Sequence, residues 1–224
     1  MTRLRDTLLF DLDGTLTDTD ALHFRAYQTL LASFGRTITH ELYKQKIMGL
    51  ANEAIMASLF PSESVQRHRA IAEEKERLFR SFAERMQPLA GLIELLAFAD
   101  RHGVKMAVVT NAPRLNAEMM LNALGLSKRF PVLVIGDELA RGKPDPLPYL
   151  TALERLDARA DRALAFEDSR SGVQAASGAG VETIGITTGI DAATLRASGA
   201  AAAISDFTDS WLRARLEGEF VMGA

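Results

Sequence analysis

The sequence predicts an α/β protein, in which a parallel sheet carries helices on both faces and a bundle of helices is inserted after the first strand. Six short apolar runs alternate with segments whose apolar residues recur at helical spacing. The apolar runs lack polar alternation, which is typical of strands that are buried on both faces. One long region between the first two runs shows only a helical pattern.

The apolar runs give the expected strands, and the helical patterns give the expected helices around them. The strands are Thr7–Asp11, Lys105–Thr110, Val132–Ile135, Ala163–Glu167, Glu182–Ile186 and Ala201–Ile204. The helices are Gly91–His102, Leu115–Leu124, Leu147–Leu156, Ser171–Ser177 and Ala192–Ala197.

The inserted region extends from about Asp18 to Arg85 and contains no convincing strand. It includes the charged stretch SVQRHRAIAEEKERLFRSFAERM, whose mixed charges predict mainly a solvated helix face. Pro88 and Gly91 mark the return to the strand-and-helix pattern. We therefore expect an α/β core formed by residues 1–17 and 88–224, and a helical domain formed by residues 18–87.

Composition excludes several classes of protein. The chain has 224 residues, of which 26 are Lys or Arg and 29 are Asp or Glu, so its net charge of −3 gives no basic excess for nucleic acid. It has no cysteine, which excludes disulfides and thiolate metal sites. It shows no signal peptide and no apolar run near the ~20 residues that span a bilayer. We expect a soluble cytoplasmic protein without nucleic-acid or membrane partners.

Polar residues gather where the expected strands end, and ligands of parallel sheets bind beyond the carboxyl ends of the strands. These residues are Asp11, Asp13 and Gly14 after the first strand, Thr110 and Asn111 after the second, Lys143 in the RGKPDP loop before the fourth, and Glu167, Asp168 and Ser169 after the fourth. If the strands are neighbours, the four carboxylates can hold a hard cation. The lysine, the hydroxyl and backbone N–H groups can then hold an anion.

Each of these features alone also has a structural interpretation. A calcium loop is excluded, because it needs Gly at its sixth position and Glu at its twelfth, where Asp11 as the first position would place Leu22. The Thr-Asn pair suits a turn, the single lysine suits a solvated loop, and the Glu-Asp-Ser run suits a helix cap. Their occurrence in order, each beside a strand end, favours a functional site.

Four segments resemble, in order, the motifs of the haloacid dehalogenase superfamily: DLDGTL, TN, KPDP and EDSRSGVQAASGAG. The resemblance covers essentially the whole chain and is to the subgroup with a helical cap inserted after the first motif. Phosphoglycolate phosphatases and β-phosphoglucomutase-like phosphatases belong to this subgroup. It implies a Rossmann-like core, with residues 18–87 as the cap domain.

The resemblance also implies a reaction, the hydrolysis of a small phosphorylated metabolite such as phosphoglycolate or a sugar phosphate. Asp11 would be the nucleophile that forms an aspartyl-phosphate, and Asp13 would serve as general acid and base. Thr110 and Lys143 would act on the transferring phosphoryl group, which Gly14 and Asn111 would help to bind. The expected Mg²⁺ ligands are Asp11, the Asp13 carbonyl and Asp168, with Glu167 assisting. An acid at the position of Asp13 favours phosphate esters over the dehalogenase and phosphonoacetaldehyde hydrolase reactions.

The start of the cap, DTDALHFRAY, is similar to that of β-phosphoglucomutases and includes their His at position 23. That family carries a Lys before the Gly of the next loop and an Arg shortly after it. Here the loop KIMGLANEA places Met48 before Gly49 and Asn52 near the Arg position. A second phosphate would lose its cationic contacts, which favours a phosphatase over a mutase. His23, Met48, Gly49 and Asn52 are candidates for substrate contact, although each also suits cap packing.

Two alternatives to the phosphatase remain from the sequence alone. One is a phosphomutase of the β-phosphoglucomutase type. The other is a non-catalytic member that binds or regulates a partner, which the presence of the nucleophile, the acid and the metal carboxylates disfavours. We expect a monomer or weak dimer whose partner is a small phosphorylated metabolite and whose cofactor is Mg²⁺.

Overall fold

The computed structural model describes residues 5–47, 50, 52–83 and 86–220. The chain forms two compact units. The core unit comprises Met1–Asp18 and Gln87–Ala224, and the cap unit comprises Thr19–Met86.

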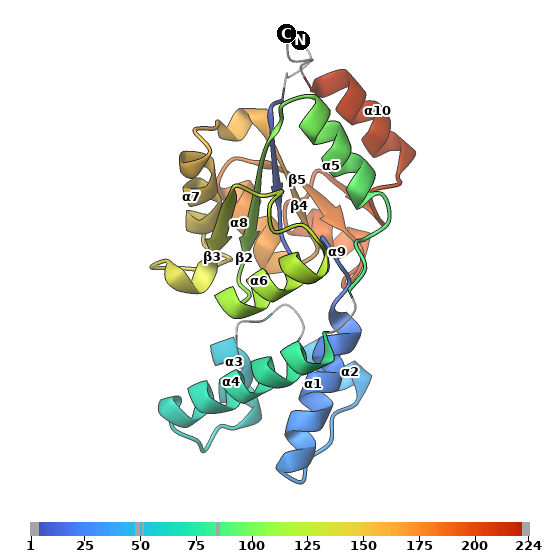
Figure 1. The fold of residues 1–224 in the computed structure, drawn as a ribbon. Coiled ribbons are helices and arrows are strands. Elements are labelled where there is room, and N and C mark those ends of the chain that lie inside the picture. The colour runs from blue at the N-terminus through green and yellow to red at the C-terminus, as the bar shows by residue number, and fades with distance from the viewer. Residues whose placement is uncertain (1–4, 48–49, 51, 84–85, 221–224) are drawn as a thin grey trace. The chain divides into compact units, whose positions relative to one another are not determined.

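The core unit is built on a six-stranded sheet in the order β3-β2-β1-β4-β5-β6, with every neighbouring pair parallel (Figure 1). The strands are β1 (Thr7–Phe10), β2 (Lys105–Thr110), β3 (Val132–Ile135), β4 (Ala163–Glu167), β5 (Glu182–Ile186) and β6 (Ala202–Ile204). The expected strands are therefore confirmed to within one residue at each end.

Helices cover both faces of this sheet, which confirms the predicted α/β fold (Figure 1). They are α5 (Leu92–Arg101), α6 (Arg114–Ala123), α7 (Leu147–Arg155), α8 (Arg170–Gly178), α9 (Ala192–Ala197) and α10 (Ser210–Glu219), with short 3₁₀ turns η1 (Gly136–Glu138) and η2 (Ala160–Arg162). Helix α10 was not expected from the sequence. Helix α8 packs between α7 and α9 on one face.

Alternation along the strands divides the sheet's side chains between the two faces. On the face of α7 and α8, Leu9 and Ala165 pack with the buried helix residues Tyr149 and Ala176. The other face carries an aromatic cluster around Phe10, whose ring centroid lies 5.7 Å from Phe130, 5.3 Å from Phe166 and 6.2 Å from Phe207. The middle strands are thus buried on both faces, as their unbroken apolar runs predict.

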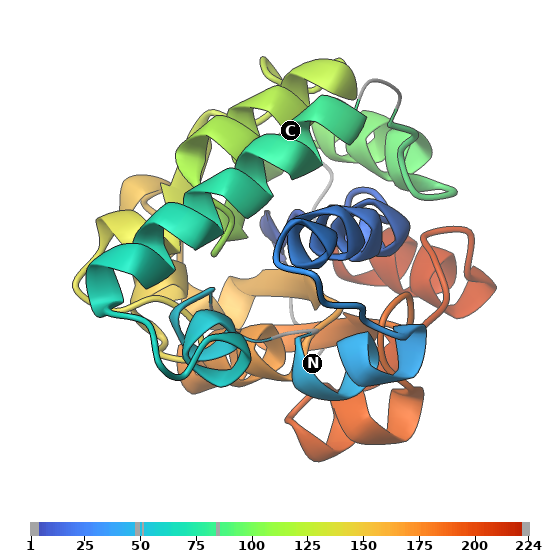
Figure 2. The same ribbon diagram turned by 90° about the horizontal axis from the view of Figure 1, so that it is seen from below.

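The cap unit contains only helices among its described residues. They are α1 (Asp20–Ser33), α2 (His40–Lys46), α3 (Asn52–Leu59) and α4 (Val65–Phe82). Figure 2 shows α4, in teal, beside the blue helix α1, with which it packs. Tyr27, Leu30 and Met56 lie in the apolar core of this unit.

The charged stretch that was expected to form mainly a solvated face corresponds to α4. Four of the eight charged residues of this helix are exposed and two are half-buried, but Lys75 and Glu76 are buried, with exposed fractions of 3% and 6%. The expectation is wrong for these two residues, because a charge pair that is internally hydrogen-bonded can replace its water contacts. None of the helices in the described part of the chain has the length and apolarity that crossing a bilayer requires.

The aromatic cluster makes a prediction about stability. Phe10 is fully buried, so Phe10→Ala should lower the free energy of unfolding by about 3–5 kcal/mol through lost burial and a cavity. Urea unfolding followed by circular dichroism measures this change. Leu115→Ala is the control, because Leu115 is 64% exposed and its loss should cost less than about 0.5 kcal/mol. Equal effects of the two substitutions would contradict the predicted core.

Candidate active site

The candidate site lies at the carboxyl ends of β1 and β4, where the strand order reverses. From β1 the chain adds β2 and β3 on one side and then returns to add β4 on the other. Such a reversal is the usual ligand position in an open parallel sheet. Phe10 is paired in register with Phe166, so the next residues, Asp11 and Glu167, lie side by side. The Asp11 N–H donates to the Phe166 carbonyl at 3.0 Å.

Three carboxylates form what we call the acidic cluster: Asp11, Glu167 and Asp168. Each offers an oxygen that lies within 4.8 Å of the others. Asp11 is buried, Glu167 is fully buried and Asp168 is half-buried. Carboxylate oxygens at this spacing fit the hard-oxygen ligand set of Mg²⁺, which takes one or two protein carboxylates and completes its shell with water or substrate.

The turn after β1 passes very close to the acidic cluster. A Cβ atom placed on Gly14 would lie 2.1 Å from Asp168 Oδ2, and Gly14 has a left-handed φ of +70°. Both facts require glycine at this position. The Gly14 N–H donates to the Thr17 carbonyl at 2.8 Å. Because the N–H and C=O of a trans peptide point in opposite directions, this bond also directs the Asp13 carbonyl away from Thr17.

One further residue of this turn, Asp13, and one residue that contacts the turn, Thr188, bear on the sequence predictions. Asp13 is half-buried, and its backbone forms an isolated parallel β-bridge with Thr17. Thr188, in the loop after β5, donates its hydroxyl to the Gly14 carbonyl at 2.6 Å. Thr188 was not singled out in the sequence, where a threonine in a loop gives no distinguishing signal.

Lys143 lies against the acidic cluster. Its Nζ atom is 2.6 Å from Asp11 Oδ1 and 2.5 Å from Glu167 Oε1. Burial lowers the pKa of Lys143, but Asp11 and Glu167 outweigh that effect and raise the pKa above its usual value. Lys143 is therefore a buried cation between two carboxylates. The sequence led us to expect Lys143 at this edge of the sheet, but with an anion as its partner.

The acidic cluster brings three carboxyl groups close to one buried lysine. Burial, partly offset by Lys143, raises the pKa of Asp11 well above its usual value. Burial also raises the pKa of Asp168, to which the charges of Asp11 and Glu167 add. One lysine does not balance three acids, so a bound cation would relieve the remaining repulsion.

Tyr149 is a site residue that the sequence analysis missed. It lies on α7, is fully buried, and donates its hydroxyl to Glu167 Oε1 at 2.6 Å. The Lys143 Nζ atom lies 5.4 Å from the centre of its ring. The sequence does place this tyrosine on the apolar face of the helix after KPDP. Because a buried phenol needs a hydrogen-bond partner, that position could have indicated a contact with a polar group of the site.

Thr110 and Asn111 follow β2 at the same edge of the sheet. Thr110 is buried, and its Oγ1 accepts a hydrogen bond from the Ala112 N–H at 3.0 Å. The Asn111 side chain binds the main chain of Lys143 twice. Its Nδ2 donates to the Lys143 carbonyl and its Oδ1 accepts from the Lys143 N–H, both at 3.1 Å. The side chain of Asn111 therefore anchors the lysine loop, whereas the sequence led us to expect it on phosphate.

The cap unit contains a second polar group, the cap cluster of His23, Asn52, Lys75 and Glu76. Lys75 Nζ lies 3.0 Å from His23 Nδ1 and 2.9 Å from Glu76 Oε1, and Asn52 Nδ2 donates to the same Glu76 oxygen at 2.9 Å. Burial raises the pKa of Glu76, but Lys75, His23 and Asn52 together lower it below its usual value. The predicted cap residues His23 and Asn52 are thus linked through Lys75 and Glu76, which were not predicted as site residues. Met48 and Gly49 lie outside the described residues.

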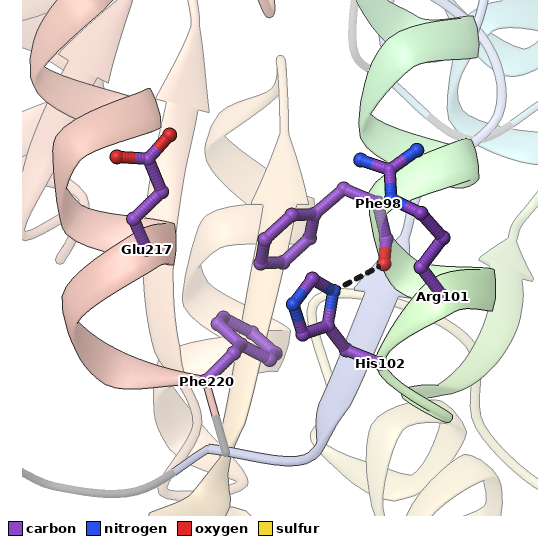
Figure 3. A pocket seen from close by; sticks show the side chains of 5 residues that line it. All are labelled: Phe98, Arg101, His102, Glu217 and Phe220. Atoms are coloured by element: carbon purple, nitrogen blue, oxygen red, sulfur yellow. Dashed lines mark hydrogen bonds between the residues drawn. The ribbon is translucent and has the colours of Figure 1, made fainter. Parts of the chain in front are cut away.

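A pocket of about 310 Å³ lies elsewhere in the core unit (Figure 3). Phe98, Arg101 and His102 of the α5 end line it with Glu217 and Phe220, and His102 Nδ1 donates to the Phe98 carbonyl at 2.8 Å. These α5 residues precede β2, so the pocket lies near the amino ends of the strands. It is separate from the acidic cluster at their carboxyl ends.

The family model for haloacid dehalogenase-like hydrolases matches residues 8–186. The matched segment begins within β1 and ends with β5, so it includes the acidic cluster, Lys143 and the whole cap unit. The chain belongs to the haloacid dehalogenase-like hydrolase family. This confirms the resemblance found in the sequence and the prediction of a hydrolase.

Relatives of this hydrolase include several phosphatases. It is 38% identical over 184 residues to a phosphorylated carbohydrates phosphatase of Thermotoga maritima, covering 80% of this chain and 83% of that protein. It is 32% identical over 179 residues to a phosphoglycolate phosphatase of Xylella fastidiosa, covering 80% and 78%. Among solved structures, a CbbY variant of Rhodobacter sphaeroides in complex with xylulose-(1,5)bisphosphate gives a TM-score of 0.80 at 28% identity, covering 92% of this chain and 96% of that one.

The raised pKa of Asp168 predicts how the stability of the metal-free hydrolase varies with pH. Above this pKa the folded wild type carries a charge that burial disfavours, and the penalty disappears as the carboxyl takes up a proton at lower pH. Asp168→Asn removes the charge at every pH. In EDTA the variant should therefore be more stable than wild type at about pH 8, and the difference should shrink toward about pH 5, above the ordinary carboxyl pKa of about 3.9.

Urea unfolding at several pH values measures this difference. The exposed Asp100, which pairs with Arg129, provides the control variant Asp100→Asn, for which we expect no such trend. A difference between Asp168→Asn and wild type that stays constant, or grows on acidification, would contradict the assignment of a buried repulsive charge.

Proposed function

We propose that the chain is a Mg²⁺-dependent phosphatase that hydrolyses a small phosphorylated metabolite through an aspartyl-phosphate on Asp11. The observation that carries the proposal is the contact of Asp11 with Lys143 at the reversal of strand order, beside Glu167 and Asp168. A carboxylate nucleophile can meet an anionic phosphate only where nearby cations neutralise the charge of both. The names of the two phosphatase relatives support the same reaction class.

The proposed reaction has two steps. An Asp11 oxygen bonds to phosphorus, the ester P–O bond breaks, and Asp13 gives its proton to the leaving oxygen. Asp13 then takes a proton from water, which attacks phosphorus and releases inorganic phosphate and the free Asp11 carboxylate. Lys143 and Thr110 hold the phosphoryl oxygens, assisted by the main chain at Gly14 and Asn111. Mg²⁺ held by Asp11, the Asp13 carbonyl and Asp168, with Glu167 assisting, would supply further charge neutralisation.

For the substrate, we propose a metabolite with one phosphate and a hydroxyl-rich remainder. His23 and Asn52 would contact the part beyond the phosphate, and Gly49, which lies outside the described residues, is a third candidate. In the described part of the cap cluster, Lys75 is already paired with Glu76, so this pair contributes no net positive charge for a second phosphate. Charge balance therefore favours a monophosphate over the bisphosphate intermediate of a mutase.

The nucleophile is tested with p-nitrophenyl phosphate in the presence and absence of Mg²⁺. Asp11→Asn should lower kcat by roughly 10³-fold or more, because removal of a nucleophile abolishes the covalent route. Asp100→Asn should retain wild-type turnover. EDTA should abolish wild-type activity and added Mg²⁺ should restore it. Wild-type turnover by Asp11→Asn would overturn the proposed mechanism.

The cap cluster is tested by a screen of phosphorylated metabolites followed by substitution of Asn52. For the preferred metabolite, Asn52→Ala should lower kcat/KM roughly 10-fold, since a lost polar contact of this kind is worth about 1–3 kcal/mol. For p-nitrophenyl phosphate, which offers no hydroxyl groups, kcat/KM should remain unchanged. An equal fall for both substrates would show that Asn52 only stabilises the cap.

The mutase alternative needs its own assay. Interconversion of β-glucose 1-phosphate and glucose 6-phosphate, primed with the bisphosphate, should proceed more slowly than release of inorganic phosphate from the preferred metabolite. Faster interconversion would identify a mutase instead.

A further inference from the structure

Glu167 Oε1 joins two buried side chains of the core unit. It accepts a hydrogen bond from the Tyr149 hydroxyl at 2.6 Å and another from the Lys143 ammonium at 2.5 Å. Tyr149 and Glu167 are fully buried, and Lys143 is 7% exposed. The phenol and the ammonium therefore share one carboxylate oxygen in a site that admits little water.

The main chain of Lys143 is fixed independently of this contact. Asn111 binds both its N–H and its C=O, and a Cβ on Gly136 or Gly142 would lie only 2.1 or 2.9 Å from Asn111 Oδ1. The Asn111 amide therefore packs closely against the backbones of Gly136 and Gly142, which leaves it little room to move. What remains free to vary is the flexible four-carbon stem of the lysine, and its ammonium is placed by Asp11 and Glu167.

The Glu167 carboxylate is itself tightly surrounded. A Cβ on Gly172 would lie 1.8 Å from its Oε2, and the Ser169 hydroxyl lies 3.4 Å from the same oxygen. Its other oxygen, Oε1, is the one that Tyr149 contacts. The strong, short hydrogen bond from the phenol thus restrains the orientation in which Glu167 receives the lysine.

We propose that Tyr149 is a positioning residue, which holds Glu167 so that the Lys143 ammonium stays on the nucleophile Asp11. This inference rests on the proposed function. Tyr149 acts through Glu167 and Lys143 and has no role as proton donor or nucleophile. Without its hydroxyl, Glu167 Oε1 keeps only the lysine as a donor among the described residues, and the carboxylate and the ammonium can move together away from Asp11.

Tyr149→Phe tests the proposal, since it removes the hydroxyl and keeps the ring. Misplacement of a catalytic group by about 1 Å can lower the rate about 100-fold, so we expect kcat for p-nitrophenyl phosphate to fall about 10- to 100-fold. KM and the Mg²⁺ concentration for half-activation should change less than about twofold. Thr183→Val is the matched control, because it removes another buried hydroxyl of the core unit, which donates to the Val181 carbonyl at 3.1 Å. The control should retain wild-type kcat.

A double-mutant cycle separates positioning from general stabilisation. If Tyr149 acts through the lysine, Tyr149→Phe should have no further effect on kcat in the Lys143→Met background. The same loss in both backgrounds would overturn the proposal, as would a Tyr149→Phe enzyme with lowered melting temperature and unchanged kcat.

Crystal structures of wild type and Tyr149→Phe give a readout that is independent of turnover. The distance from Lys143 Nζ to Asp11 Oδ1 should lengthen in the variant, and an unchanged contact would overturn the positioning role. Absence of phosphatase activity in the wild type would overturn the proposed function alone, so the two failures can be told apart.

Discussion

The structure depends on one electrostatic constraint, which is that three acids at the carboxyl ends of β1 and β4 face a single buried cation. Burial raises the pKa values of Asp11 and Asp168, so the cluster is held together against its own repulsion. Lys143 offsets part of that repulsion, and truncating one partner of such a buried group leaves uncompensated charge. Much of the surrounding backbone serves this arrangement, including glycines at 14 and 172, where any side chain would collide with a carboxylate.

The cap unit also buries charged side chains, but there the positive and negative charges balance. It also buries a lysine, but Lys75 faces one carboxylate, Glu76, whose pKa stays below its usual value. The pair is balanced and further held by His23 and Asn52. Of the two clusters, only the one in the core unit has an excess of acids that a cation would relieve. This difference supports the proposal that the metal-dependent chemistry belongs to the core and polar recognition to the cap.

Long-range contacts also explain which residues escaped prediction. Tyr149 and Thr188 have ordinary surroundings in the sequence, and each acquires a role only through a partner 18 or 174 residues away. The same holds for Lys75 and Glu76, whose charges suit an exposed helix face until the opposing helices supply partners. Helix α10 has a mixed pattern and was missed for a local reason, because only Leu212 and Leu216 are buried along it.

The sequence by itself determined the strands, most helices of the core, the helical nature of the insert and the family, because apolar periodicity and short motifs are local properties of the chain. It also identified Asp11, Glu167 and Asp168 at strand ends and Lys143 in the loop before the fourth strand. Only the tertiary structure decided which of them touch. The register of β1 against β4 sets Asp11 beside Glu167, and a loop 32 residues beyond Asn111 engages its amide. Such pairings depend on strand order and packing, which no local pattern encodes.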